Sequence, residues 1–299
     1  MAVTVEKLTP HIGALISGVD AAVELDEATG KAVVDAWLAH GVILLRGQSL
    51  TDHQQANFSR LFGTLAERSR PAEKRNEGKR GEADPYDGYT MLVTNIREKG
   101  KPIGSLPDGD MMFHADLVYR EIPSRATILY GIEVPKQGGD TLFASLTAAY
   151  EALDDDTLSL IEGKRAIQGY HYGIMHRQDN VPLQSYLHPL VQVIPETGRK
   201  ALFASRLMTM SVEGMGKDAS DALLAKLFDH IEEPRFVYTH KWRPGDLLVW
   251  DNRATVHGRT DFDPNQRRLL RRFATSGAPP VAASGGASGA RGGALGATR

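Results

Sequence analysis

The sequence of 299 residues contains no cysteine. Disulfide bonds, thiolate metal sites and a cysteine nucleophile are therefore excluded, and the composition fits a reducing cytoplasm. Also absent is any apolar run that approaches the roughly 18 residues of a membrane-spanning helix. The opening residues lack the basic, apolar and small-residue pattern of a secretory signal. We therefore expect a cytoplasmic protein that does not insert into a membrane.

An excess of charge of one sign is missing as well. The chain has 35 basic and 37 acidic residues, so its formal net charge is −2, and no overall field attracts nucleic acid or an anionic membrane. Hydrophobic residues make up 41% and charged residues 24%, which is ordinary for a soluble protein with a sizeable core. We expect a single domain over residues 1–276 that acts on a small molecule, with a homo-oligomer left open.

Turn and helix signals divide the chain into many short segments. Gly41 follows a helical apolar pattern and favours its end, and Thr51 with Gln54 matches a capping box. The helices that we expect lie at residues 27–40, 50–62, 146–153, 157–161 and 220–231. Short strands are expected within the first twenty residues and at residues 42–45, 126–130, 142–143, 201–203, 236–240, 247–250 and 269–273. This pattern predicts a mainly β fold with flanking helices and a jelly-roll core.

Two parts of the chain differ in composition from the rest. The region 68–110 contains two polar stretches rich in charge, Gly and Pro. Because long loops in compact domains are usually functional or disordered, we expect a loop or lid there. Residues 277–299 are rich in Gly, Ala and Ser, with almost no large apolar side chain. Such a segment buries too little surface to offset its ordering entropy, so we expect a disordered tail.

Histidine and aspartate residues form a candidate metal site. His114 and Asp116 are two residues apart, and in an extended segment such side chains point to the same face. Together with His257 they supply two imidazoles and one carboxylate, the ligand set of a non-haem Fe(II) oxygenase. The competing pair, His230 and Glu232, ends a helical pattern in which side chains two apart diverge. We expect His230 to act as a cation at the helix C-terminus.

Four arginines lie within residues 267–272, ten residues and more after His257. On a strand, Arg268 and Arg272 face the same way, so both charges can point inward. The alternative for this segment is a basic surface patch that binds nucleic acid.

At these residues the chain resembles the taurine dioxygenase/2,4-dichlorophenoxyacetate dioxygenase family of Fe(II)- and 2-oxoglutarate-dependent oxygenases. The resemblance spans most of residues 1–275, and its motifs occur in the family's order and spacing. The matching stretches are residues 113–116 (FHAD), 134–143 (VPKQGGDTLF), 188–191 (HPLV), 197–203 (TGRKALF) and 250–253 (WDNR), followed by His257, Arg268 and Arg272.

The resemblance implies a double-stranded β-helix with His114, Asp116 and His257 as iron ligands. It implies further that Thr141 hydrogen-bonds a carboxylate of 2-oxoglutarate and that Arg268 pairs with the distal carboxylate. A guanidinium can bind a carboxylate through two parallel hydrogen bonds, and such a pair is stronger inside a barrel than on a surface.

The substrate side of the family pattern has one match and two departures. Arg272 matches the position that meets the anionic end of the prime substrate. Met208 stands where several members carry an aromatic side chain over the substrate. Asp110, four residues before His114, stands where sulfonate-using members have an asparagine. A carboxylate there repels an anionic substrate unless it is protonated or paired with Arg272.

The resemblance implies an Fe(II)- and 2-oxoglutarate-dependent dioxygenase that uses O2 to hydroxylate a small organic acid and releases succinate and CO2. We expect a phenoxyalkanoate-like or a sulfonate or sulfate compound as the anionic substrate. One alternative is a non-catalytic, cupin-like metal- or ligand-binding protein with the same barrel. Another is a divalent-metal hydrolase, which needs a general base near a metal-bound water and gives no reason for Thr141 and Arg268.

Overall fold

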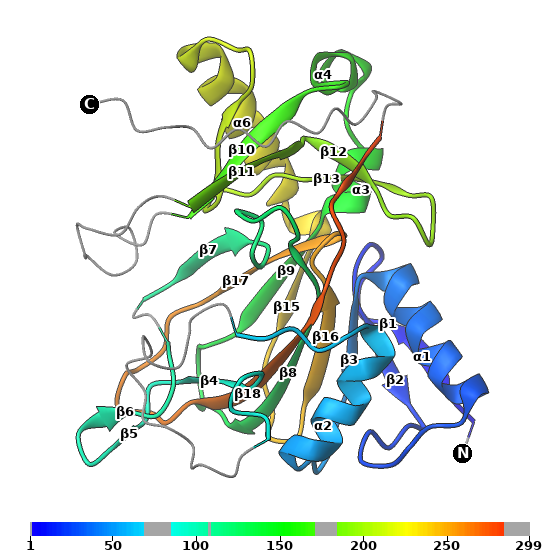
Figure 1. The fold of residues 1–299 in the computed structure, drawn as a ribbon, viewed down its shortest axis with the longest axis vertical. Coiled ribbons are helices and arrows are strands. Elements are labelled where there is room, and N and C mark those ends of the chain that lie inside the picture. The colour runs from blue at the N-terminus through cyan, green and yellow to red at the C-terminus, as the bar shows by residue number, and fades with distance from the viewer. Residues whose placement is uncertain (1, 69–84, 107–108, 171–183, 284–299) are drawn as a thin grey trace.

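The computed structural model describes residues 2–68, 85–106, 109–170 and 184–283. Its centre consists of two β-sheets packed face to face, with helices on the outside (Figure 1). The fold is mainly β with a jelly-roll core, as the sequence predicts. In the described ranges, no helix has both the length and the apolar character needed to cross a membrane.

The larger sheet has seven strands in the order β1-β2-β3-β16-β8-β18-β4. Neighbours are antiparallel, except that β2 and β3 are parallel. The strands are β1 (Thr4–Lys7), β2 (Ala14–Ser17), β3 (Val42–Leu45), β16 (Leu247–Asp251), β8 (Ser124–Glu133), β18 (Leu269–Ser276) and β4 (Met91–Thr94).

The smaller sheet has four antiparallel strands in the order β15-β9-β17-β7. They are β15 (Val237–His240), β9 (Thr141–Ser145), β17 (Thr255–Arg259) and β7 (Met111–His114). An apolar cluster that includes Phe143, Leu248, Trp250 and Leu270 fills the space between the two sheets.

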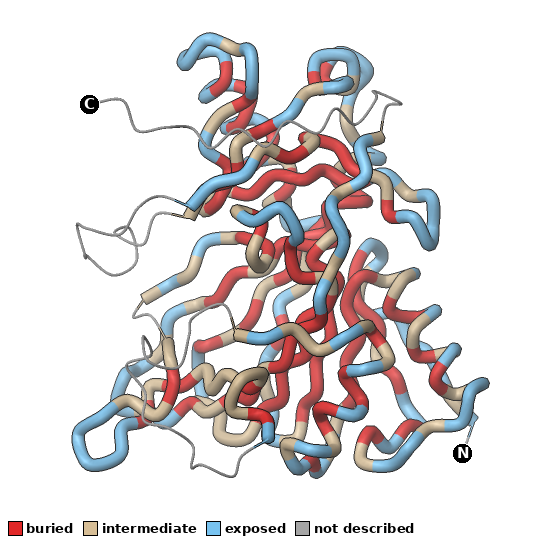
Figure 2. Tube along the Cα trace, viewed as in Figure 1, coloured by how far each residue is buried: buried red, intermediate tan, exposed pale blue. Residues whose placement is uncertain are grey.

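The central strands of the larger sheet are apolar on both faces because both faces are covered (Figure 2). In β3, Val42 and Leu44 belong to the cluster between the sheets. Ile43 and Leu45 belong to a second cluster, which packs against α1 (Glu27–His40) and α2 (Asp52–Ser59). The two-residue side-chain period of a strand thus explains a continuous apolar run.

The remaining elements form a third apolar cluster above the smaller sheet, around α6 (Lys217–Ile231) and α3 (Leu146–Glu151). Two three-stranded sheets lie there, in the orders β11-β10-β14 and β13-β12-β19. Their strands are β11 (Gln184–Pro189), β10 (Arg165–Tyr170), β14 (Thr209–Val212), β13 (Lys200–Leu202), β12 (Val191–Val193) and β19 (Val281–Ala282). The other elements are η1 (Arg60–Phe62), β5 (Arg97–Glu98), β6 (Lys101–Pro102), α4 (Asp155–Ile161) and η3 (Pro234–Phe236).

Most expected elements are present, with differences at their ends, but several strands were not expected, among them β10, β14 and β17. The helix expected at 220–231 begins three residues earlier, at Lys217, and Phe236 belongs to a 3-10 turn instead of a strand. The expected loop at 68–110 contains β5 and β6, and also β4, which pairs with β18. Residues 69–84 and 107–108 of that loop lie outside the described residues.

The expected disordered tail differs from the structure at its start. Disorder was expected from residue 277, but β19 pairs with β12 through Val281 and Ala282. Backbone hydrogen bonds to an open strand edge make this possible without large side chains. Residues 284–299 of the expected tail lie outside the described residues.

The capping box at the start of α2, which the sequence predicts, allows a test of how much Thr51 contributes to stability. The Thr51 side chain accepts a hydrogen bond from the Gln54 backbone amide, and the Gln54 side chain accepts one from the Thr51 amide. We expect Thr51→Ala to lower the free energy of unfolding by about 1 kcal/mol, measured by urea denaturation. Thr51→Ser keeps the cap and is the control; equal stability of the two variants would contradict the prediction.

Candidate metal centre

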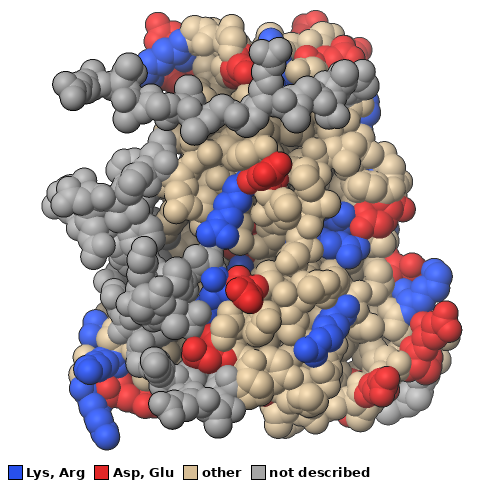
Figure 3. Space-filling view, in the orientation of Figure 1, with Lys and Arg blue, Asp and Glu red and all other residues tan. Residues whose placement is uncertain are grey.

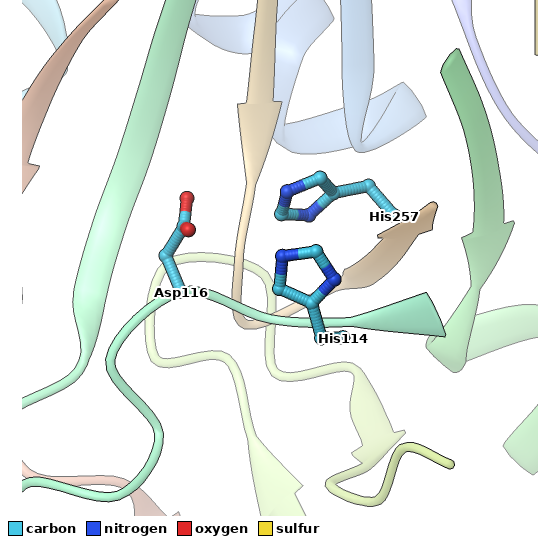
Figure 4. Close-up of side chains that lie close together, drawn as sticks. All are labelled: His114, Asp116 and His257. Atoms are coloured by element: carbon cyan, nitrogen blue, oxygen red, sulfur yellow. The ribbon is translucent and has the colours of Figure 1, made fainter. Parts of the chain in front are cut away.

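The three candidate ligands meet at the edge of the smaller sheet (Figure 4). His114 ends β7, and His257 lies opposite it in the middle of β17. The centroids of their rings are 4.2 Å apart, and one ligand atom from each of the three side chains lies within 4.8 Å of the others. Within the described part of the chain, this is the one group of three or more His, Asp or Glu residues with such spacing.

Asp116 reaches the histidines from a turn. The expectation that His114 and Asp116 share an extended segment is wrong, because β7 ends at His114 and a turn begins at Asp116. Leu117 in this turn has φ of 59°, a left-handed conformation that is uncommon for a residue with a side chain. The turn is held by hydrogen bonds from the Asp116 amide to Asn252 Oδ1 (3.1 Å) and from the Ser124 amide to the Asp116 carbonyl (3.2 Å).

Burial sets the protonation of the candidate ligands. Burial lowers the pKa of His257 to about 3, with the nearby His114 as the second cause. The pKa of His114 is also lowered by burial, although Asp116 acts in the opposite direction. Burial by itself raises the pKa of Asp116, but Arg272 and the two histidines outweigh it and lower the pKa. The site therefore holds two neutral imidazoles and one carboxylate, the forms that bind a metal ion.

A hydrogen bond fixes which ring nitrogen of His114 is free to bind a metal ion, whereas His257 has no such bond among the described residues. His114 Nδ1 lies 3.0 Å from the Met112 carbonyl, and because a carbonyl only accepts, Nδ1 donates and Nε2 keeps a free lone pair. His257 Nδ1 is buried and has no hydrogen-bond partner among the described residues. Such a donor set fits a divalent iron ion, which takes imidazole and carboxylate ligands.

A glycine sets how closely β7 and β17 approach. A Cβ atom at Gly258 would lie 2.8 Å from the Met111 carbonyl oxygen, which is closer than packing allows. The missing side chain therefore lets the backbones of His114 and His257 pair directly.

The carboxylate of Asp116 is held through one of its two oxygens. Thr127 Oγ1 donates to Oδ2 at 2.6 Å, and Arg272 Nη2 lies 2.9 Å from the same atom. Asn252 Nδ2 donates to Thr127 Oγ1 (3.1 Å), and Trp250 Nε1 donates to Asn252 Oδ1 (3.2 Å). No described residue hydrogen-bonds Oδ1, so this oxygen can serve as the single metal ligand of Asp116.

Arg268 is a buried cation without a carboxylate partner among the described residues. It is 2% exposed, and its Nη2 lies 3.4 Å from the Gly139 carbonyl. Its Nε and Nη1 have no hydrogen-bond partner in the described ranges. Burial first, and then Arg259, lower the pKa of Arg268 to about 9, so it is charged at neutral pH. A buried guanidinium in this state fits a bound carboxylate, which would supply both charge and hydrogen-bond acceptors.

The other arginines of the segment 267–272 each pair with a carboxylate. The pairs are Arg267 with Glu133, Arg271 with Asp52, and Arg272 with Asp116. Only Arg267 among the four has a largely exposed side chain. On the face seen in Figure 3, basic and acidic side chains are interspersed. These observations do not support a basic patch at this segment.

Thr141 is the first residue of β9 and is buried. Its cross-strand partners are Arg259 on β17 and His240 on β15. Its hydroxyl accepts a hydrogen bond from Trp242 Nε1 at 2.9 Å.

Asp110 and Met208, the two departures from the family pattern, both contact other residues of the protein. Asp110 is exposed just before β7, and its carboxylate accepts a hydrogen bond from the Asp261 amide. No described hydrogen bond or ion pair joins Asp110 to Arg272. Met208 is 5% exposed and belongs to the apolar cluster around α6.

The sequence reasoning missed three residues that shape the site, namely Thr127, Asn252 and Trp242. Thr127 is a polar residue inside the apolar run of β8, and its position facing the space between the sheets was a usable signal. Asn252 follows a buried strand directly, which is a common place for functional polar residues. Nothing in the sequence pattern pointed to Trp242, because its contact with Thr141 depends on the pairing of β15 with β9.

Comparisons with known proteins agree with this geometry. Residues 4–274 match the family model described as taurine catabolism dioxygenase TauD, TfdA family. The (S)-phenoxypropionate/alpha-ketoglutarate-dioxygenase of Sphingobium herbicidovorans is 32% identical, over 91% of this chain and 94% of that protein. The alpha-ketoglutarate-dependent sulfate ester dioxygenase of Pseudomonas putida is 29% identical, over 94% and 92%. The crystal structure of AAD-2 with Mn(II) and N-oxalylglycine superposes with a TM-score of 0.77 at 28% identity, covering 94% of this chain and 100% of that chain.

Thr127 provides a test of how Asp116 is held. We expect Thr127→Val to weaken Mn(II) binding by about tenfold or more, because residues that orient a ligand from behind typically contribute this much. The dissociation constant can be measured by electron paramagnetic resonance of free Mn(II). Thr127→Ser keeps the hydroxyl and should bind like the wild type. Unchanged affinity in Thr127→Val would show that the hydroxyl does not orient Asp116.

Proposed function

Because the chain belongs to the TauD, TfdA family of dioxygenases, we propose that it is an Fe(II)- and 2-oxoglutarate-dependent dioxygenase that hydroxylates a small organic acid. The observation that carries the proposal is the convergence of His114, Asp116 and His257 on one site. The buried Arg268 adds a cation that has no carboxylate partner among the described residues. The first three supply a ligand set for iron, and the last supplies a buried positive charge for a dicarboxylate co-substrate.

In this proposal His114, Asp116 and His257 hold the ferrous ion. When bound, the ion supplies the O2 chemistry by which 2-oxoglutarate and a substrate C–H group become succinate, CO2 and a hydroxylated product. Arg268 binds the distal carboxylate of 2-oxoglutarate, and Thr141 donates a hydrogen bond to one of its carboxylates. The protein's own contribution is to position the reactants and to exclude water from them.

We assign the anionic end of the prime substrate to Arg272. Its side chain keeps 21% of its surface exposed while it pairs with Asp116, so it can contact a second anion. The Tyr119 and Tyr170 rings stack at 5.2 Å, and the pKa of Tyr119, raised mainly by burial, also responds to Asp116 and Arg272. We propose that these rings contact the apolar or aromatic body of the substrate, as in a phenoxyalkanoate.

Two further residues complete the proposed substrate side. Met208 offers a small apolar surface to the substrate at the position where several family members carry an aromatic side chain. Asp110 directly precedes β7, and its carboxylate accepts a hydrogen bond from the Asp261 amide. A sulfonate or sulfate substrate remains the second choice, and one relative is named for sulfate esters.

The non-catalytic alternative has less support. Two relatives that match over nine-tenths of this chain are named as dioxygenases that use alpha-ketoglutarate. A metal hydrolase also gives no reason for the buried guanidinium of Arg268, which has no carboxylate partner among the described residues. The cytoplasmic location, the homo-oligomer and the absence of nucleic-acid and membrane partners stay predictions from the sequence.

A substrate panel tests the proposed function directly. With Fe(II), ascorbate and 2-oxoglutarate, we expect succinate release to be stimulated most by phenoxyalkanoates and less by alkyl sulfates or sulfonates. Phenoxyethanol and an alkylammonium compound serve as neutral and cationic controls. If only these controls stimulate succinate release, the role of Arg272 is refuted. If no compound leads to turnover of 2-oxoglutarate, the result counts against the proposed reaction itself.

Arg268 tests the co-substrate site. We expect Arg268→Met to raise the KM for 2-oxoglutarate by about 30-fold or more, because it removes one partner of a buried, hydrogen-bonded charge pair. The matched control is Arg267→Met, which removes the exposed neighbour that pairs with Glu133 and should leave this KM unchanged. Initial rates of succinate formation give both values. Similar KM values for the two variants would place the distal carboxylate elsewhere.

A further inference from the structure

Trp242 touches the proposed co-substrate site without belonging to the family motifs described above. Its Nε1 donates a hydrogen bond to Thr141 Oγ1 at 2.9 Å. Trp242 lies in the connection between β15 and β16, two residues after His240. Thr141 and His240 are directly opposite each other in the β9–β15 pair, so the indole lies beside the start of β9.

The direction of this hydrogen bond constrains the Thr141 hydroxyl. An indole N–H can only donate, so Thr141 Oγ1 must accept from it. The hydroxyl hydrogen is then directed away from Trp242, and no described residue accepts a hydrogen bond from it. A hydroxyl oriented in this way is a donor prepared for an acceptor such as a carboxylate oxygen.

The indole itself is held in place from several sides. The His240 ring meets it edge-on, with centroids 4.6 Å apart and an interplanar angle of 87°. Gly131 on β8 leaves room for it, since a Cβ atom there would lie 3.1 Å from Trp242 Cε3. The indole also packs against the apolar cluster between the sheets.

A buried polar cluster fixes His240 in turn. His240 is fully buried, its Nδ1 lies 2.9 Å from the Tyr238 hydroxyl, and its Nε2 lies 3.2 Å from Asp246 Oδ2. Arg46 Nη1 donates to both oxygens of Asp246, at 3.0 and 2.8 Å, and the Arg243 amide donates to Oδ2. The contact between His240 Nε2 and Asp246 is not a hydrogen bond by its geometry, so the hydrogen bond to Tyr238 and the pairing of Asp246 with Arg46 are what hold this cluster. Buried polar clusters of this kind rigidify the groups that they contact.

We propose that Trp242 is a positioning residue for the co-substrate, which acts by orienting the Thr141 hydroxyl toward a carboxylate of 2-oxoglutarate. The proposal rests on the function proposed above, because it needs Thr141 to bind that co-substrate. His240, Asp246 and Arg46 support it by holding the indole. Trp242 thus has a part in co-substrate binding through a hydrogen bond and not only through packing.

A double-mutant cycle on the full-length, Mn(II)-loaded protein tests this without turnover. The dissociation constant of 2-oxoglutarate is measured by calorimetry for the wild type, Trp242→Phe, Thr141→Val and the double variant. We expect about threefold to tenfold weaker binding in Trp242→Phe and about tenfold or more in Thr141→Val. In the double variant, Trp242→Phe should add nothing to Thr141→Val, because the hydroxyl on which it acts is gone.

Three outcomes overturn the proposal. Independent, multiplicative losses in the double variant would show that the indole acts by packing. Unchanged binding in Trp242→Phe would remove its role altogether. A wild-type protein that does not bind 2-oxoglutarate would overturn the proposed function and this inference with it, which separates that failure from the first two.

Controls separate loss of the donor from loss of the ring. Trp37→Phe is the matched variant, because Trp37 is fully buried and its Nε1 has no hydrogen-bond partner among the described residues. It should leave 2-oxoglutarate binding unchanged. Where Trp242→Phe does not fold, β-(3-benzothienyl)alanine at position 242 keeps the ring shape and removes only the N–H. Mn(II) affinity should be the same in every variant.

Discussion

The partly buried carboxylate of Asp116 carries a negative charge that neighbouring groups stabilise, and these contacts determine the arrangement of the site. One oxygen accepts a hydrogen bond from Thr127 on β8 and forms an ion pair with Arg272 on β18, and both strands belong to the larger sheet. The residue itself follows β7, at the edge of the smaller sheet. The interaction therefore joins the two sheets at the point where the histidines meet. It also divides the carboxylate into an oxygen bonded to the protein and an oxygen available to a metal ion, which limits Asp116 to one mode of coordination.

A similar division between satisfied and unsatisfied polar groups is found among the arginines at residues 267–272. Three arginines at the start of β18 and just before it have carboxylate partners, whereas Arg268 has none among the described residues. Buried charges in folded proteins are normally paired. Burial lowers the pKa of this cation, and a bound dicarboxylate would supply the partner that it lacks among the described residues. Affinity for the co-substrate is thereby linked to the electrostatics of the core.

Much of this could be predicted from the sequence, because patterns of local origin carry the information. The capping box at Thr51, the helix end at Gly41 and the strand at 42–45 each depend on neighbouring residues. The ligand residues were identified through motif order, and the structure brings His114, Asp116 and His257 together. The turn at Asp116 was missed because the left-handed Leu117 gives no signal in its residue type. The role of Trp242 depends on strand pairing between residues 101 positions apart, which no local pattern encodes. Thr127 is only 11 residues from Asp116, but their contact depends on the turn that was missed.

The close contact at Gly258 has a consequence for how this site can diverge. Because no side chain fits between that position and the Met111 carbonyl, the spacing of the two imidazoles is determined by the main chain. Mutational drift can alter the loops, the aromatic rings and the charges around the cavity, and hence the molecules admitted to it. It cannot place a side chain at position 258 without parting the two strands that carry the imidazoles. Selectivity for the substrate can thus change during evolution while the strand spacing at the metal site stays the same.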